Sequence, residues 1–221
     1  MVSETEVKHA AFVRFTGKGG SIFVGLLLIG FIGTLLCRAK QTGPNGLPAS
    51  LPDGVHTGDI VFFRGTRIRS MAVRFLDPGP GAMSHLGILI RTDSSLLVAH
   101  ASPYSPDNTS PRVRLEPLDT VLREGKVASM LLYRCTVDSA GDKAAKWACI
   151  FAESGLPFDT DFDLTTDTAL YCTELVYRAY LRAGLDIVTE TLDTVTHPFG
   201  KKTVLFPTNI ARSSFLRKVY P

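Results

Sequence analysis

The chain has 221 residues, of which 45% are hydrophobic and 20% are charged, and its formal net charge is +3. This length and composition fit one sizeable globular domain with a small extra segment. The basic residues form no long run, so the electrostatic surface that a nucleic-acid-binding protein needs is missing, and nucleic acid is excluded as a partner.

The cysteines restrict the class of protein further. Cys37, Cys135, Cys149 and Cys172 are scattered singly, without a C-x-x-C pair. This spacing argues against a zinc site and against a dense disulfide scaffold. A disulfide between Cys135 and Cys149 is an alternative, but lone buried thiols explain both residues as well and are favoured.

The N-terminal region contains a candidate membrane segment. Residues 1–18 form a polar tail, and residues 19–37 are nineteen positions without a charged side chain. A run of this length can cross the hydrocarbon core of a bilayer, so we predict a single transmembrane helix over residues 19–37. Three basic residues precede the segment and two follow it, which places the rest of the chain on the non-cytoplasmic side.

Two other interpretations of this segment are disfavoured. A cleaved signal peptide usually has a shorter apolar core and a small-x-small cleavage site, which is missing here. Lipid attachment at Cys37 is a poor fit because Leu36 precedes it and Arg38 follows it. We therefore expect an uncleaved membrane anchor.

Residues 38–54 are rich in Gly and Pro and predict a linker, so the globular domain is expected over residues 55–221. Its first strand is predicted at residues 58–64, followed by strands at residues 84–91 and 96–101. If the turn between these two strands is centred between Thr92 and Asp93, His85 lies directly opposite His100. Both imidazoles then project from the same face of the sheet.

The remaining elements predict an α+β domain. We expect a strand at residues 112–116, a helical turn at 118–123, a central strand at 130–135, and a strand and a short terminal helix in the tail after residue 203. An amphipathic helix over residues 142–154 should carry Trp147 and Ile150 inward. Carboxylates alternate in Asp159, Asp161 and Asp163, but the Gly and the closing Glu of a calcium loop are absent, so no metal site is predicted.

The residues from Leu170 to Gly184 predict a helix that begins with a cysteine. Cys172, Leu175, Val176, Ala179 and Ala183 follow steps of three and four, so they form one stripe that should face the protein, and Gly184 suits the helix end. A thiol in the first turn of a helix lies near free backbone amides and the positive end of the helix dipole, which favour its ionised, nucleophilic form.

Four segments together carry a family resemblance: S-H-L-G-I-L-I, V-A-H-A, G-L-P-F-D-T-D-F-D and Y-C-T-E-L-V. Their order resembles the circularly permuted papain-like hydrolases of the NlpC superfamily, most closely the YiiX-like branch, and also the lecithin retinol acyltransferase relatives. The similarity covers roughly residues 55–215 and excludes the membrane segment. It implies a papain-like permuted antiparallel sheet packed on helices.

The resemblance also implies roles for individual residues. Cys172 corresponds to the nucleophile, His85 to its general base, and His100 to the polar residue that orients His85. The oxyanion would be bound by the backbone amide of Cys172, helped by the hydroxyl of Tyr171. No cofactor is required. YiiX-like members often carry an acidic residue in the third position, whereas the acyltransferase relatives carry histidine, so His100 leaves the substrate class open.

We therefore expect a membrane-anchored thiol hydrolase, an amidase or peptidase, that acts on a small peptide or amide through a thioester on Cys172. One alternative is a lipid acyl hydrolase or acyltransferase of the lecithin retinol acyltransferase type. Another is a catalytically idle binding module that keeps the fold. The idle module is disfavoured because competent residues occupy all three polar positions.

Overall fold

The computed structural model describes residues 13–17, 20–24, 54–66, 70, 73–74, 76–77, 83–104, 110–197 and 200–220. These residues belong to two compact units. One contains a four-stranded sheet and the other a six-stranded sheet with the helices. Residues 193–204 belong to the first unit, so the domain expected over residues 55–221 is interrupted by this segment.

The four-stranded sheet of the first unit has the order β2-β1-β8-β9. Its strands are β1 (Val13–Gly17), β2 (Gly20–Val24), β8 (Asp193–His197) and β9 (Gly200–Val204). All neighbouring strands in it are antiparallel.

Strand β2 differs from the helix expected over residues 19–37. The structure makes Gly20–Val24 a strand paired with β1, and the Ile, Phe and Val side chains of this segment have high β-propensity. Residue 19 and residues 25–37 lie outside the described residues, as do most of the polar tail and residues 38–53 of the linker. Within the described ranges, no helix combines the length and the apolar character needed to cross a bilayer.

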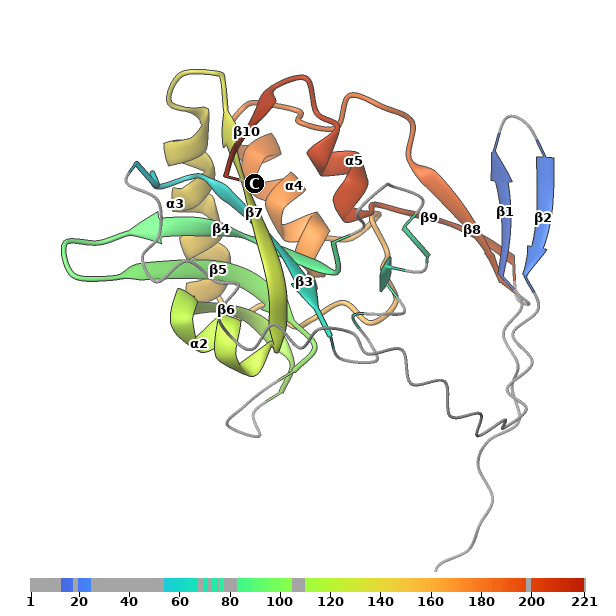
Figure 1. The fold of residues 1–221 in the computed structure, drawn as a ribbon, viewed down its shortest axis with the longest axis horizontal. Coiled ribbons are helices and arrows are strands. Elements are labelled where there is room, and N and C mark those ends of the chain that lie inside the picture. Colours follow the sequence, from blue (N-terminus) through green and yellow to red (C-terminus); the bar gives the residue numbers. More distant parts are fainter. Residues whose placement is uncertain are drawn as a thin grey trace, which may run out of the picture. The chain divides into compact units, whose positions relative to one another are not determined.

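The six-stranded sheet of the second unit is antiparallel throughout and has the order β10-β7-β3-β4-β5-β6 (Figure 1). Its strands are β3 (Ile60–Gly65), β4 (His85–Arg91), β5 (Leu96–Ser102), β6 (Arg112–Pro117), β7 (Val127–Cys135) and β10 (Leu216–Tyr220). This arrangement confirms the predicted α+β class. The expected terminal helix is instead the edge strand β10, which pairs with β7.

Helices cover this sheet. They are α2 (Leu118–Glu124), α3 (Ala140–Glu153), α4 (Cys172–Arg182) and α5 (Pro207–Ala211). Figure 1 shows α3 and α4 beside one another against the sheet. Their buried residues pack with Ile60, Phe62, Leu86, Ile88 and Ala99 in the larger core cluster. The alternate residues of the same strands form a second cluster, with α2, on the opposite face.

One detail of the predicted core is wrong. The helix over residues 142–154 is present as α3, and Trp147 packs against the core, but Ile150 is 44% exposed. The buried positions of α3 are alanines instead, at residues 140, 144, 145 and 148. These small side chains let α3 lie close to the sheet and to α4, which turns Ile150 outward. The free thiols at Cys135 and Cys149 confirm that the two residues form no disulfide.

Candidate active site

Cys172 is the first residue of α4, as the sequence predicts. Tyr171 precedes it in an extended conformation, with φ −95° and ψ 171°, and so caps the helix. The predicted inward stripe is present, because Leu175, Val176 and Ala179 are fully buried. Gly184 ends the segment with φ +90°, a conformation that glycine adopts without strain.

The environment of the Cys172 thiol favours its neutral form. Burial raises the pKa of Cys172, and hydrogen bonds from the Thr173 hydroxyl and from the backbone N–H groups of Leu86, Thr173 and Cys172 oppose this increase only in part. The sulfur lies 3.8 Å from Thr173 Oγ1. Desolvation therefore has a larger effect on the thiol than the backbone amides at the helix start, which were expected to favour the thiolate.

The two predicted histidines meet in the structure. His85 Nε2 lies 2.8 Å from His100 Nδ1, with the rings edge to face at a centroid distance of 5.0 Å. The predicted register, however, is wrong by two residues: β4 and β5 pair as Ile88↔Ala99 through Arg91↔Leu96. The turn is centred one residue later than expected, so the histidines are diagonal neighbours, still on one face.

Gly87 makes this diagonal approach possible. At the observed register Gly87 stands opposite His100. A Cβ atom added to Gly87 would lie 2.6 Å from Val98 Cγ1, 2.7 Å from the Ala99 carbonyl oxygen and 3.1 Å from His100 Cβ. Only a residue without a side chain lets β5 and the His100 ring come this close to β4.

A third side chain, which the sequence analysis did not identify, continues the contact. His100 Nε2 lies 2.8 Å from Glu116 Oε2 on the neighbouring strand β6. Arg114 lies 3.6 Å from the other carboxylate oxygen, Oε1. His100 is 4% exposed, and hydrogen bonding to it lowers the pKa of Glu116. His100 and Glu116 are 16 residues apart in the sequence, and a single sequence gives no sign of such a contact between strands. From their pattern alone, residues 112–116 predict an ordinary exposed strand.

His85 is held by its neighbours as a neutral ring. It stacks on Phe63 with a centroid distance of 5.8 Å and an interplanar angle of 21°. Burial, and then the neighbouring His100, lower the pKa of His85 well below its ordinary value. At neutral pH the imidazole is therefore unprotonated and has one nitrogen free to accept a proton.

The structure does not join the thiol directly to the imidazoles. Cys172 packs with the core cluster on the face of the sheet that α3 and α4 cover. His85 instead stacks on Phe63, which belongs to the cluster on the opposite face, beside α2. The described residues contain no hydrogen bond between the Cys172 sulfur and either ring. The link between them is the backbone of β4, because the N–H group that contacts Cys172 belongs to Leu86, the residue after His85.

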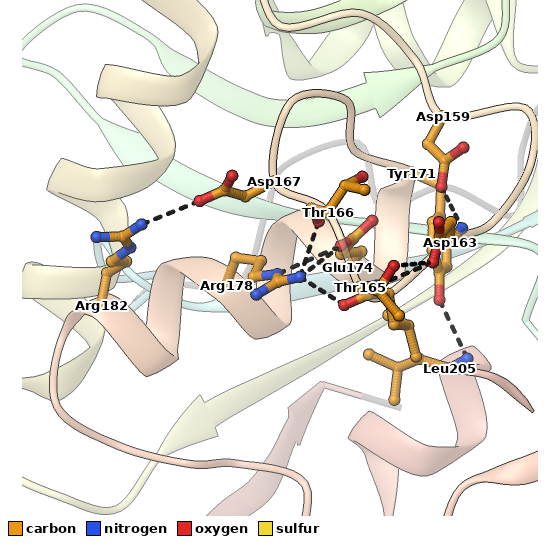
Figure 2. A network of polar contacts seen from close by, with 11 residues as sticks. Asp159, Asp163, Thr165, Thr166, Asp167, Tyr171, Glu174, Arg178, Arg182 and Leu205 are labelled. Atoms are coloured by element: carbon orange, nitrogen blue, oxygen red, sulfur yellow. Dashed lines mark hydrogen bonds and ion pairs between the residues drawn. The ribbon is translucent and has the colours of Figure 1, made fainter.

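A loop closed by its own hydrogen bonds leads into Cys172. Asp159 is 7% exposed and accepts hydrogen bonds from the backbone N–H groups of Asp161 at 2.7 Å and Asp163 at 2.5 Å. Asp163 in turn accepts from the backbone N–H and the hydroxyl of Thr165. These carboxylates are thus occupied in shaping the loop (Figure 2).

The same loop is tied to α4 by Arg178. Its guanidinium donates to the carbonyl oxygens of Leu164 at 2.7 Å and Thr166 at 2.8 Å, and to Glu174 Oε1 at 3.2 Å (Figure 2). Glu174 is fully buried, and this burial raises its pKa to about 7 despite the guanidinium. The first turn of α4 and the loop before Cys172 therefore form one polar unit.

Tyr171 contributes to the packing of this region. Its hydroxyl is the acceptor for the backbone N–H of Leu205 at 3.1 Å, and the residue is 2% exposed. Burial also raises the pKa of Tyr171. The hydroxyl therefore keeps its proton and can still donate one hydrogen bond.

Comparison with solved structures identifies a protein of the same fold, the metalloprotein YiiX from Escherichia coli O157:H7. The two chains share 20% sequence identity and a TM-score of 0.58, and the alignment covers 75% of this chain and 98% of that one. In the part of the present chain that the structure describes, no three His, Cys, Asp or Glu side chains are grouped so as to hold a metal ion.

Sequence comparison gives the family. No curated protein sequence matches the chain. A family profile, however, matches residues 54–220, that of the permuted papain-like amidase enzymes YaeF/YiiX of the C92 family. The match covers the whole six-stranded sheet, the histidine pair and the cysteine helix. The chain therefore belongs to the YaeF/YiiX, C92 family of permuted papain-like amidases.

Proposed function

We propose that the protein is a cysteine amidase or peptidase in which Cys172 is the nucleophile, His85 the general base and His100 the residue that positions His85. The observation that carries this proposal is the 2.8 Å contact between His85 and His100, next to the backbone position that contacts the sulfur of Cys172. Acyl transfer to a thiol needs a base for the thiol proton and a partner that fixes the base.

The proposed reaction has two steps. His85 takes the proton from the Cys172 thiol as the sulfur attacks the acyl carbon, and then gives this proton to the departing amine as the C–N bond breaks. Because the two groups have no direct contact among the described residues, this transfer requires the imidazole to come within reach of the sulfur when the substrate binds. Water, deprotonated by His85, next attacks the acyl carbon of the thioester; the C–S bond breaks, the acid is released, and the leaving sulfur takes the proton back from His85. Because the thiol and the imidazole are both neutral at rest, the proton moves during the attack and no ion pair exists beforehand.

The oxyanion of this reaction requires hydrogen-bond donors. The first helical N–H groups of α4, including that of Cys172, have no partner within the helix, and the helix dipole adds positive potential there. We propose the Tyr171 hydroxyl as a second donor, since it accepts from Leu205 and has its own proton to offer. Tyr171→Phe should then lower kcat on the order of 10²-fold.

Tyr180→Phe provides the matched control for Tyr171. Tyr180 is also fully buried on α4, and its hydroxyl donates to the Gly58 carbonyl oxygen at 2.9 Å. Both substitutions remove one buried hydrogen bond and should destabilise the fold by about 1–3 kcal/mol. Equal kcat values in the two variants would show that the Tyr171 hydroxyl has a purely structural role.

Four single variants test the nucleophile and the base. Hydrolysis of an activated ester such as p-nitrophenyl acetate is expected to be lost in Cys172→Ala and His85→Ala. Cys135→Ala and Cys149→Ala are the controls, because both residues are free thiols outside the acyl-transfer set. A comparable loss in all four variants would mean that the nucleophile is assigned wrongly.

The role of His100 is tested by graded replacement. His100→Ala should keep more activity than His85→Ala, because a positioning residue contributes less than the base itself. His100→Asn and His100→Glu can still accept a hydrogen bond from His85, so they should recover part of the loss. Full activity in His100→Ala would leave His100 without a role in the chemistry.

The substrate class is proposed from the family and from the site. An amide or a short peptide is the first choice, because the family is one of amidases. A lipid acyl group is the second, because His100 occupies the position that is histidine in the acyltransferase relatives. Release of amine from a peptide library, compared with release of fatty acid from phospholipid vesicles, separates the two substrates.

We also propose that residues 19–37 attach the protein to a membrane in a single pass, with the enzymatic unit on the non-cytoplasmic side. The support is the run of nineteen residues without charge between Lys18 and Arg38. The proposal requires Gly20–Val24 to be helical in a bilayer, whereas the structure has them in strand β2. The two states exclude one another.

Carbonate extraction distinguishes the two states. The full chain should remain in the membrane pellet after an alkaline carbonate wash, and a variant that lacks residues 1–45 should be found in the supernatant with its activity retained. A full-length chain with an intact N-terminus that is wholly soluble would favour strand β2 and rule out the anchor.

A further inference from the structure

The contact network of the histidines extends beyond the three proposed catalytic positions. On strands β4, β5 and β6, the side chains of His85, His100 and Glu116 form a continuous row of two contacts, each 2.8 Å long. The register places His100 opposite Arg114 and Val98 opposite Glu116, so the three side chains share one face of the sheet. This row ends in a carboxylate.

The ionisation of Glu116 fixes the direction of its contact. Its hydrogen bond to His100, with smaller help from Arg114, lowers its pKa although burial acts in the opposite direction. At neutral pH Glu116 is therefore a carboxylate, which can only accept hydrogen bonds. It follows that His100 Nε2 carries the proton of this contact.

The second contact follows from the first. In its neutral form the His100 imidazole has one N–H group and one bare nitrogen, so in that form donation from Nε2 to Glu116 leaves Nδ1 as an acceptor. The group opposite Nδ1 is His85 Nε2, which must then be the donor. Because His85 is neutral at neutral pH, its remaining nitrogen, Nδ1, is bare and able to take a proton.

We propose that Glu116 is a positioning residue that sets the tautomer of His85 through His100, an inference that rests on the proposed role of His85 as the base. Without an acceptor at Glu116, His100 can turn its N–H toward His85. His85 then accepts at Nε2 and carries its proton on Nδ1, where it cannot take the thiol proton. Arg114, 8% exposed and 3.6 Å from Oε1, holds the carboxylate so that Oε2 faces His100.

Two substitutions of Glu116 grade the effect. Glu116→Gln keeps the shape and an acceptor oxygen, but its amide also offers donors, so His100 can bind in either orientation. Glu116→Ala removes the acceptor altogether. Glu190→Gln is the control, because Glu190 is a half-exposed carboxylate 3.5 Å from Arg212 and its loss costs an ion pair outside the histidine row.

The direct measurement is the ¹⁵N NMR spectrum of the imidazole nitrogens in the full-length protein, with His85 assigned from the His85→Asn variant. The wild type should show a protonated Nε2 and a bare Nδ1 on His85. Glu116→Gln should show a mixture of the two tautomers, and Glu116→Ala should show mostly protonated Nδ1. Thermal unfolding by circular dichroism identifies any variant that does not fold, and Glu116→Gln, equal in shape, remains informative if Glu116→Ala unfolds.

Acetyl transfer from p-nitrophenyl acetate gives the functional readout. Glu116→Gln should lower kcat about tenfold or more with KM unchanged, and it should cause no further loss in a His100→Ala background, since Glu116 acts only through His100. The inference is overturned if wild-type His85 carries its proton on Nδ1, if the tautomer is the same in all folded Glu116 variants, or if Glu190→Gln lowers kcat equally.

These results separate the inference from the proposed function. The tautomer is observed without turnover, so a tautomer change in Glu116→Gln supports the inference even if Cys172→Ala remains active, in which case the proposed nucleophile fails alone. Conversely, loss of activity in Cys172→Ala with an unchanged His85 tautomer in the Glu116 variants overturns the inference and leaves the nucleophile assignment in place.

Discussion

At the scale of single residues, the balance between burial and hydrogen bonding decides the state of the Cys172 thiol. The start of α4 supplies N–H groups that favour a thiolate, yet desolvation has the larger effect and raises the pKa of Cys172. The pKa of the His85 imidazole changes in the opposite direction, because burial lowers it. At neutral pH both changes favour the uncharged form of the side chain.

This balance predicts the pH dependence of Cys172 alkylation. With a raised pKa, the thiolate is scarce at neutral pH, so the rate of iodoacetamide reaction at Cys172 should rise about tenfold per pH unit through neutral pH without an acidic plateau. Peptide mapping separates Cys172 from Cys135 and Cys149. A fast rate that is constant across acidic pH would indicate a thiolate–imidazolium pair and contradict the neutral assignment.

The residue scale also shows what a sequence can and cannot reveal. The helix start at Cys172 and the shared face of His85 and His100 were predictable, because residue type and local pattern indicate them. Glu116 was not predictable, because it joins the row only through the lateral order of β4, β5 and β6. The direction of the Cys172 pKa was missed for a similar reason, since burial depends on the packed neighbours.

At the scale of elements, the β4–β5 hairpin holds the two histidines together. The sequence pattern predicts that both lie on one face, which is correct, but it opposes them directly because the expected turn is centred one residue too early. In the structure, the Thr92 side chain contacts the Ser95 backbone and closes a turn centred after Asp93. A two-residue shift leaves the face unchanged, whereas a one-residue shift would have separated the imidazoles.

Gly87→Ala tests this element. The added Cβ would be only 2.7 Å from the Ala99 carbonyl oxygen, a backbone atom, so β5 must move away from β4 and take His100 with it. Ester hydrolysis should fall by an order of magnitude or more, together with thermal stability. Gly141→Ala is the control, because its nearest neighbour would be 3.5 Å away and alanine favours the helix.

An undiminished rate in Gly87→Ala would show that β5 can shift without disturbing the site. The same result would weaken the argument that the His85–His100 contact carries the chemistry. A loss of stability alone, with kcat retained, would limit Gly87 to a packing role.

At the scale of the whole molecule, the fold class and family were predictable, whereas its division into units was not. Alternation and helical periodicity identify β3, β4, β5, β7, α3 and α4, which build the core. The terminal strand β10 was missed because Arg217 and Lys218 are exposed on it, so it has no apolar alternation. Residues 193–204 join a different sheet through pairing with β1, a long-range contact that local patterns do not contain.

Global stability should depend on pH through Glu174. Its pKa is about 7 in the folded chain, against 4.5 ordinarily, so the folded state binds more protons than the unfolded state between these values. Stability should consequently decrease as pH rises from about 5 to about 8. Glu174→Gln, which can still accept from Arg178, should remove this part of the decrease.

Thermal unfolding of wild type and Glu174→Gln across this pH range checks the sign. The variant should gain stability relative to wild type as pH rises. Glu190→Gln serves as a control, because that carboxylate is half exposed. A variant that instead becomes less stable than wild type at high pH would show that the Glu174–Arg178 ion pair outweighs the desolvation of Glu174.

The measurement closest to the central claim is the detection of an acyl group on Cys172. The full-length protein is mixed with p-nitrophenyl acetate, quenched with acid within the first turnover, and mapped by peptide mass spectrometry. We expect an acetyl thioester on Cys172, formed far more slowly in His85→Ala and absent in Cys172→Ala. Acetylation of another residue at the rate of turnover, or undiminished turnover in Cys172→Ala, would contradict it.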